Sequence, residues 1–172
     1  LDKKISKIFI EKFINEVQKV KVGNPMDKET VVGPLIRNSE VERVDDWVNE
    51  SVKNGADLLM GGKIISNSTY DKTILMNPNK KDKISNLEIF GPVVTINEYE
   101  NFDDAVDLAN SVDVSFQASI FSDKVHEVLK FYEKINASAV FHNEHTAFRV
   151  DWMPFAGLKH SGHGIGGIKY SM

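Results

Sequence analysis

The residues best suited to ligand chemistry lie in one short run, residues 87–94. Glu88 and Phe90 are two positions apart, and Gly91, Pro92 and an apolar segment follow them. If the run is a strand, both side chains point to the same face. Glu88 would then offer acceptor oxygens to a diol, and Phe90 a flat surface to a ring. This pattern predicts a site for a ribose that carries a planar heterocycle. A solvated carboxylate and a core aromatic are the alternatives.

Two other patterns suggest chemistry less well. Residues 162–167 contain G-x-G-x-x-G, but a dinucleotide fingerprint needs a preceding strand and a later acid, and here a loop precedes the run. His142 and His145 are close in sequence, yet they lie at the end of a predicted strand and not on the helix of a zinc protease motif. We therefore expect no metal site. Asn143 closes this strand and, from the residues alone, is expected to be a turn residue that hydrogen-bonds its own backbone.

Hydrophobic periodicity predicts the elements that must position these residues. Apolar residues recur at three- and four-residue steps in four stretches, with Asp2, Ser39 and Ser122 as expected N-caps and Val41, Val44, Val48 and Val52 as one buried stripe. The predicted helices span residues 2–20, 39–54, 102–111 and 123–135. The predicted strands span residues 57–60, 73–77, 92–98, 118–121 and 137–142.

Strands and helices alternate from residue 92 to residue 142, which is typical of an α/β fold with a mostly parallel sheet flanked by helices. Ligands of such sheets bind at the carboxyl ends of the strands. Residues 24–37 and 79–85 are expected to be loops, the second with no role beyond solubility. The last thirty residues are expected to form a Gly-rich loop and one helical turn.

Composition excludes several classes of partner. The chain has 172 residues, of which 41% are hydrophobic and 27% charged, as in one soluble globular domain. A formal net charge of −4 gives no reason to expect nucleic acid or a membrane surface as a partner. No long apolar run or signal-peptide pattern is present, so we expect a cytoplasmic protein. The absence of cysteine excludes thiol catalysis within this chain.

Three motifs give the chain a family resemblance. Residues 88–94 resemble the cofactor motif of the NAD(P)-dependent aldehyde dehydrogenases, and residues 153–164 resemble the Pro-Phe-Gly-Gly-x-Lys-x-Ser-Gly-x-Gly signature of that family, with Ala156 in place of a Gly. Residues 21–36 resemble the family's link between two helices. Residues 153–155, which begin the second motif, and residues 168–172 are similar to the lactaldehyde and nonphosphorylating glyceraldehyde-3-phosphate members of the family.

The resemblance implies roles for four residues. Glu88 would bind the nicotinamide ribose hydroxyls of NAD or NADP, and Phe90 would pack beside the nicotinamide ring. Phe155 would form a wall of the aldehyde pocket, with core packing as the alternative. Arg149 would line the substrate mouth, with a plain surface position as the alternative. The substrate would be a small-molecule aldehyde.

The resemblance also implies a domain assignment. Residues 1–172 would be the C-terminal portion of the catalytic domain, truncated at both ends and without the Rossmann domain. The cysteine nucleophile would lie upstream of Leu1, so no catalytic residue is expected within the chain, and the isolated chain is expected to be inactive. The parent enzyme would be a homo-oligomer that oxidises an aldehyde to an acid through a cysteine thioester. A non-enzymatic remnant or interaction domain with the same fold is the alternative.

Overall fold

The chain forms two compact units, which we describe separately. The computed structural model describes residues 1–170. The first unit is Leu1–Glu100, and the second begins at Asn101. The sequence predicted one domain without a linker. Neither Gly nor Pro, the residues that usually mark a boundary, stands beside the division between the two units. No helix within residues 1–170 is long and apolar enough to cross a membrane.

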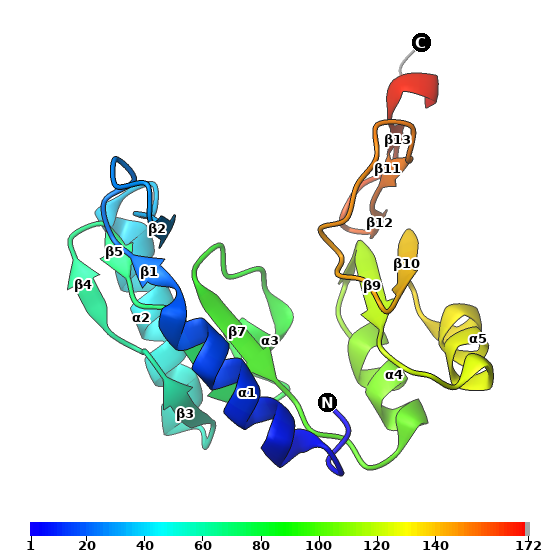
Figure 1. Cartoon of the computed structure of the whole chain (residues 1–172), viewed down its shortest axis with the longest axis horizontal. Coiled ribbons are helices and arrows are strands. Elements are labelled where there is room, and N and C mark those ends of the chain that lie inside the picture. Colours follow the sequence, from blue (N-terminus) through cyan, green and yellow to red (C-terminus); the bar gives the residue numbers. More distant parts are fainter. Residues whose placement is uncertain (171–172) are drawn as a thin grey trace. The chain divides into compact units, whose positions relative to one another are not determined.

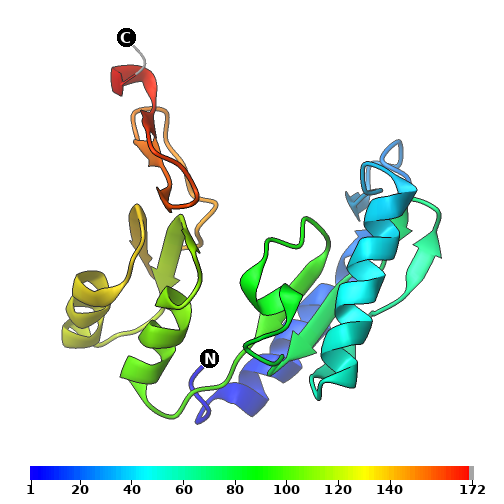
Figure 2. The same cartoon turned by 180° about the vertical axis from the view of Figure 1, so that it is seen from behind.

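The first unit is built on a three-stranded sheet between two helices. Strand β6 (Thr73–Met76) is central, antiparallel to β3 (Asp57–Met60) and parallel to β7 (Val93–Ile96). Helices α1 (Ser6–Lys19) and α2 (Asn38–Lys53) lie on opposite faces of this sheet (Figure 1 and Figure 2). The sheet is thus covered on both sides, which confirms the α/β class.

The hydrophobic core of the first unit centres on α2. Val41, Val44 and Val48 recur at helical spacing and are at most 1% exposed, as the sequence predicted. Val52 was also predicted to be buried, but 38% of it is exposed, because Ser51, which is fully buried, takes the inward position in the last turn of α2. The three buried valines, Val41, Val44 and Val48, pack in one cluster with Ala56, Tyr70, Leu75 and Ile84.

The predicted N-caps were wrong. Helix α1 begins only at Ser6, and Asp2 instead forms a β-bridge with Tyr99. No side chain caps α2, whose N-cap residue is Arg37. Ser122 is not the N-cap of α5 (Val125–Lys134), although its hydroxyl accepts a bond from Lys124 N–H at 3.2 Å. These caps failed because each helix begins a few residues later, or one earlier, than its apolar pattern suggests.

Residues 79–85 do more than keep the chain soluble. They lead into a short helix, α3 (Lys83–Asn86), and Asp82 at its N-cap is only 3% exposed. The carboxylate of Asp82 accepts bonds from Asn54 Nδ2 at 2.6 Å and from Asn79 N–H at 3.1 Å. Asp82 therefore ties the end of α2 to the segment that leads toward Glu88.

The second unit contains a strand–helix–strand arrangement. Strands β9 (Gln117–Ile120) and β10 (Ala139–His142) are parallel and in register, and α5 connects them. Helix α4 (Phe102–Asn110) packs on α5 through the rings of Phe102 and Phe131, whose centroids are 6.4 Å apart. This unit matches the predicted alternation of strands and helices.

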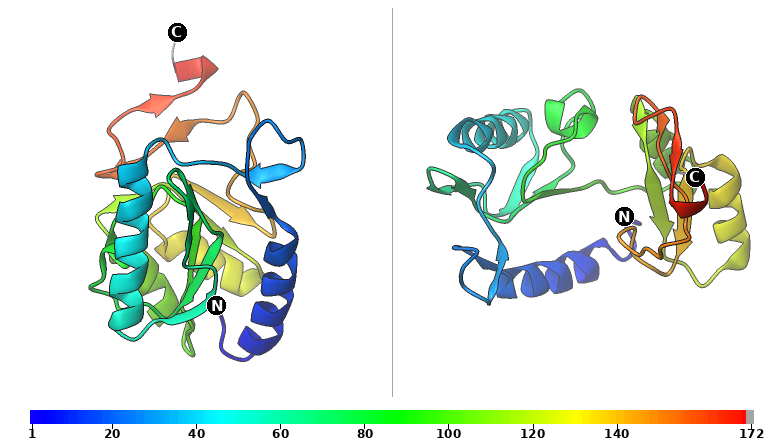
Figure 3. Two further views of the ribbon diagram at one scale, coloured as in Figure 1. Left: turned by 90° about the vertical axis from the view of Figure 1, so that its left-hand side faces the viewer. Right: turned by 90° about the horizontal axis from the view of Figure 1, so that it is seen from above.

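Short strand pairs that the sequence did not predict complete both units. In the first unit β1 pairs with β2, which lies inside the predicted loop 24–37, and β4 pairs with β5. In the second unit, β8 pairs with β12 and β11 with β13 (Figure 3). A 3₁₀ turn, Ile168–Tyr170, then ends the described chain, and Ser171 and Met172 lie outside it. The short strands of the first unit are β1 (Lys21–Val22), β2 (Thr30–Val32), β4 (Ile64–Ser66) and β5 (Thr69–Tyr70). Those of the second unit are β8 (Val114–Ser115), β11 (Phe155–Ala156), β12 (Leu158–Lys159) and β13 (Ile165–Gly166).

Candidate functional site

Glu88 and Phe90 line one open cavity in the first unit. The cavity has a volume of about 640 Å³. One side is formed by the loop that carries Glu88 and Phe90, and the other by the N-terminal half of α2 and the residues before it. The other lining residues are Pro34, Leu35, Ile36, Arg37, Glu40, Arg43 and Trp47. The volume lies within the range of small-molecule sites.

The two residues share this cavity for a different reason from the one predicted. The prediction placed them on one face of a strand, but residues 87–92 form a loop between α3 and β7. Phe90 has a positive φ of 44°, which is uncommon for a residue with a Cβ. The expected strand geometry was therefore wrong, and the loop's own shape brings the two side chains to the cavity.

Both side chains are open to solvent. Phe90 is 73% exposed, and Glu88 is also exposed. Among residues 1–170, no side chain forms an ion pair or hydrogen bond with the Glu88 carboxylate. A carboxylate with both oxygens free and a bare ring beside it can accept bonds from hydroxyls and cover a planar group.

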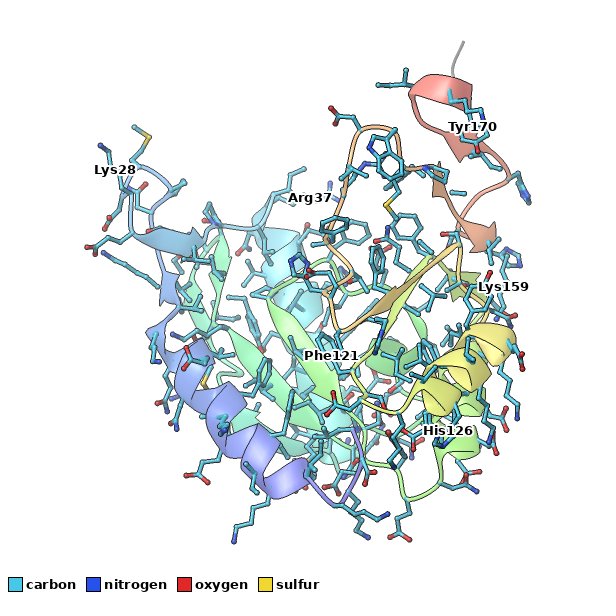
Figure 4. The ribbon with its side chains drawn as sticks, turned by 45° about the vertical axis from the view of Figure 1, so that its right-hand side comes forward. Lys28, Arg37, Phe121, His126, Lys159 and Tyr170 are labelled. Carbon is cyan, nitrogen blue, oxygen red and sulfur yellow. The ribbon has the colours of Figure 1, made fainter. Side chains whose placement is uncertain are left out.

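The α2 side of the cavity carries a polar network. Glu40 accepts bonds from Arg43 Nε at 2.8 Å and from Arg37 Nη2 at 3.1 Å. The neighbouring guanidiniums of Arg43 and Arg37 lower the pKa of Glu40 below its ordinary value. Arg43 also lies over the Trp47 ring, 4.7 Å from its centroid. Figure 4 shows Arg37 at the end of α2 where the helix begins.

The Glu88–Phe90 loop lies directly on α2. Arg43 Nη2 donates to the carbonyl of Ile89, between the two candidate residues, at 2.6 Å. At Gly91 the backbone approaches the helix so closely that an added Cβ would lie 2.9 Å from Val44 Cγ2. The loop therefore depends on α2 for its position.

Arg149 and Phe155 lie together in the second unit. The guanidinium of Arg149 stacks over the Phe155 ring, and the Phe116 ring meets the Phe155 ring edge-to-face, with 4.8 Å between the ring centroids. Arg149 Nη2 lies 3.4 Å from the carbonyl of Met153. Phe155 is 49% exposed, so it is not the core residue of the alternative interpretation.

The rest of the second motif builds a turn. Ser161 Oγ accepts a bond from Ser115 N–H at 2.9 Å, and Lys159 Nζ donates to the carbonyls of Asn110 and Val112, each at 2.7 Å. Lys159, labelled in Figure 4, thus satisfies carbonyls at the end of α4. Gly157 allows the turn to close, because a Cβ there would lie 2.5 Å from the carbonyl oxygen of Ser161.

Asn143 and His142 both bond to backbone groups of Ser122. Asn143 adopts a positive φ of 53°, and its Oδ1 accepts a bond from Ser122 N–H at 3.0 Å, so it joins the turns that follow β9 and β10. His142 Nε2 lies 2.8 Å from the carbonyl of Ser122. In residues 1–170 no three His, Asp or Glu side chains are placed to hold a metal ion.

The sequence analysis missed the α2 residues of the cavity. Arg37, Glu40, Arg43 and Trp47 follow one another at steps of three, three and four, which places them on one helical face. That polar face lies beside the valine stripe and was a readable signal. Only its proximity to residues 88–90 could not be read from the sequence.

Comparison with known proteins gives one consistent result. The family model described as "Aldehyde dehydrogenase family" matches residues 1–172. A 3-sulfolactaldehyde dehydrogenase from Priestia aryabhattai is 39% identical over 164 residues, which are 95% of this chain and 34% of that protein. A lactaldehyde dehydrogenase from Methanocaldococcus jannaschii is 37% identical over 172 residues, which are 100% of this chain and 36% of that protein.

Solved structures agree with the sequence matches. Aldehyde dehydrogenase 21 from Physcomitrella patens, in complex with the reaction product succinate, superposes with a TM-score of 0.95 at 32% identity over 99% of this chain and 35% of that one. Glyceraldehyde-3-phosphate dehydrogenase GapN from Methanocaldococcus jannaschii, complexed with NADP, has a TM-score of 0.93 at 36% identity, over 99% of this chain and 37% of that one. The chain spans about a third of the length of the curated relatives it matches.

Proposed function

This chain belongs to the aldehyde dehydrogenase family, and we propose that it forms part of an oxidoreductase that converts an aldehyde to a carboxylic acid with NAD or NADP. The relatives include a GapN complexed with NADP and an NAD-dependent aldehyde dehydrogenase from Sinorhizobium meliloti. In this proposal, the chain contributes the part of the site that orients the nicotinamide end of the cofactor.

The shared cavity of Glu88 and Phe90 carries this proposal. The free carboxylate of Glu88 suits the two hydroxyls of a ribose, and the exposed Phe90 ring suits the flank of a nicotinamide. The cavity is large enough for both groups. The residues present therefore fit the nicotinamide nucleoside half of the cofactor.

The chain's own residues have an orienting role in the reaction. A bound nicotinamide ring supplies the hydride acceptor. Glu88 holds the sugar by accepting hydrogen bonds from its hydroxyl groups, and Phe90 limits rotation of the ring by covering one side of it. Neither side chain exchanges a proton or forms a covalent bond, so their contribution is geometric.

Arg149 and Phe155 are proposed as the aldehyde contacts. Several relatives are named for aldehydes that carry a hydroxyl or an acid group, such as 3-sulfolactaldehyde and lactaldehyde. An Arg guanidinium beside a half-exposed aromatic face offers donors to such a polar end and an apolar wall to the carbon chain. We therefore propose a small polar or anionic aldehyde as the substrate.

The remaining catalytic parts must come from outside these residues. The 172 residues contain no cysteine, so a cysteine nucleophile that forms the thioester would be supplied by further protein. We propose that residues 1–172 are the C-terminal portion of a catalytic domain, that they have no turnover alone, and that the whole enzyme is a cytoplasmic homo-oligomer.

The site is tested by titrating the 172-residue chain with nicotinamide mononucleotide and following backbone NMR shifts. We expect shifts at Glu88, Phe90 and the facing turn of α2. Glu88→Gln and Phe90→Ala should each weaken binding by about tenfold, because a charge-assisted bond or a ring contact is lost.

Leu87→Ala is the matched control, since Leu87 is exposed in the same loop but does not line the cavity. Equal weakening by this control, or shifts that avoid the cavity, would contradict the proposal. A separate assay of the purified chain with lactaldehyde and either cofactor tests the expected inactivity. Turnover there would refute that part, whereas a chain that binds no nicotinamide nucleotide would favour the non-enzymatic alternative.

A further inference from the structure

We propose that Arg43 is a positioning residue that holds the loop of residues 88–91 in the shape that directs Glu88 and Phe90 into the cavity. This inference rests on the function proposed above for those two side chains. Arg43 would act through the backbone of Ile89 and not by touching the cofactor.

The contacts of Arg43 join three parts of the first unit. Its Nη2 donates to the Ile89 carbonyl at 2.6 Å, and its Nε donates to Glu40 at 2.8 Å. Its guanidinium lies 4.7 Å from the centroid of the Trp47 ring. With only 27% of its side chain exposed, Arg43 is partly shielded from water, where charge-assisted bonds are stronger.

The Ile89 carbonyl is an effective point at which to hold this loop. It belongs to the peptide plane between Ile89 and Phe90, and the orientation of that plane sets ψ of Ile89 and φ of Phe90. Phe90 has a φ of 44°. A residue with a Cβ keeps this unfavourable conformation only when its surroundings hold it there. A bond to the carbonyl oxygen opposes the rotation that would release Phe90 from this conformation.

Two neighbouring contacts restrict the loop on either side of this bond. Ile89 is partly buried and packs on the hydrophobic core cluster. Gly91 lies against Val44, with no room for a Cβ. Rotation of the plane between Ile89 and Phe90 is the freedom that these contacts leave, and Arg43 restricts it.

The geometry requires arginine specifically. A guanidinium presents separate donors in a fixed plane, so one group can bind Glu40 and the Ile89 carbonyl together while it stacks on Trp47. A lysine ammonium in the same place would keep the charge near Glu40 but lose the planar arrangement.

Arg37 provides a matched comparison. It donates to the same Glu40 carboxylate, at 3.1 Å, but within residues 1–170 it makes no hydrogen bond to residues 88–91, and its side chain is 71% exposed. Substitution of Arg37 therefore removes a charge next to Glu40 without removing the bond to the loop.

The test measures backbone order in the ligand-free 172-residue chain by ¹⁵N relaxation. In the unsubstituted chain, we expect the Phe90 amide order parameter to be about 0.85, the value of rigid backbone. Arg43→Gln should lower it to below about 0.6, whereas Arg37→Gln should leave it unchanged. Arg43→Lys should give an intermediate value, and because it keeps the stem and charge, it covers the case in which Arg43→Gln does not fold.

The second readout is the affinity for nicotinamide mononucleotide. We expect Arg43→Gln to weaken it by about tenfold, and Lys53→Gln, at the far end of α2, to leave it unchanged. An Arg43→Gln or Arg43→Lys chain whose Phe90 is as ordered as in the unsubstituted chain would overturn this inference. Loss of order without any nucleotide binding in the unsubstituted chain would instead support the positioning role and overturn the proposed function.

Discussion

The guanidinium carbon of Arg149 lies 4.7 Å from the centroid of the Phe155 ring. This stacking covers one face of the ring with a cation, while the ring of Phe116 meets it edge-to-face at 4.8 Å. The N–H groups of a stacked guanidinium point outward in the plane of the guanidinium, so they remain available to an anion at the edge of that group. The pair thus combines an apolar surface with charged donors.

The first prediction concerns the substrate's polar end. In a complete enzyme that contains these residues, Arg149→Gln should raise the KM for an anionic aldehyde such as succinate semialdehyde by about tenfold or more, because a charge-assisted bond is lost. The KM for a neutral aldehyde such as propionaldehyde should change by less than about threefold. Steady-state kinetics with both aldehydes check this.

Phe155→Leu serves as the comparison for Arg149, since it keeps an apolar wall but removes the stacking surface. It should affect both aldehydes alike. Equal effects of Arg149→Gln on the two aldehydes would show that Arg149 only supports Phe155 and does not bind the charge.

The second prediction concerns alkaline pH. Tyr70 is fully buried, and its hydroxyl donates to Asp45 Oδ1 at 3.1 Å. Burial, together with the Asp45 carboxylate, raises the pKa of Tyr70 well above its ordinary value of 10.0. The unfolded chain loses this proton first, so Tyr70 adds no pH dependence to the free energy of unfolding below about pH 10 and lowers that free energy as the pH rises above 10.

Urea unfolding at several pH values measures this slope. One such group lowers the free energy of unfolding by at most about 1.4 kcal/mol per pH unit. Tyr70→Phe should remove this part of the slope and cost about 1 kcal/mol at neutral pH, through the lost hydrogen bond. Tyr132→Phe, at a ring that is 67% exposed, is the control. An unchanged slope in Tyr70→Phe would assign the alkaline loss to other groups.

The third prediction tests the buried Asp82. Asp82→Ala should lower the free energy of unfolding by about 3 kcal/mol, because Asn54 Nδ2 and Asn79 N–H would lose their acceptor. Asp82→Asn, which keeps one acceptor oxygen, should cost less. The exposed Lys81→Ala should have little effect, and a similar loss in that control would count against a specific role for Asp82.

The fourth prediction tests the turn of residues 157–161. Gly157→Ala should lower the free energy of unfolding of the second unit by about 1–3 kcal/mol, since its Cβ would overlap backbone atoms of Ser161. The Ser115 amide resonance should shift as its bond to Ser161 weakens. Gly164→Ala has open space and should change neither quantity. If Gly157→Ala behaves like Gly164→Ala, the turn tolerates a side chain.

Elements with strong periodicity could be predicted from the sequence. The valines of α2, the β9–α5–β10 alternation and the strands β3, β6 and β7 all follow from local hydrophobic pattern. Two-residue strands such as β8 and β12 could not, because the bonds that define them join residues over forty positions apart, as in Leu158 and Ser115. Helix starts were misplaced because apolar spacing does not report the first hydrogen-bonded turn.

The residues of the candidate site could be proposed from the sequence, but the backbone geometry that holds them could not. Glu88 and Phe90 were chosen by residue type and spacing, yet the segment predicted to be a strand is a loop. The positive φ of Phe90 could not be read from the sequence, because Phe usually avoids that conformation. Arg43 was missed because its partner is a backbone carbonyl 46 positions away. Such a contact leaves no trace in local sequence pattern.

Because the backbone at Phe90 is left-handed, the Glu-Ile-Phe-Gly-Pro segment would not keep its conformation when transferred alone to another protein. A short peptide with this sequence would relax toward ordinary negative φ and separate the carboxylate from the ring. Grafting the segment onto another scaffold would therefore need the α2 turn with Arg43 and Val44 to be transplanted with it.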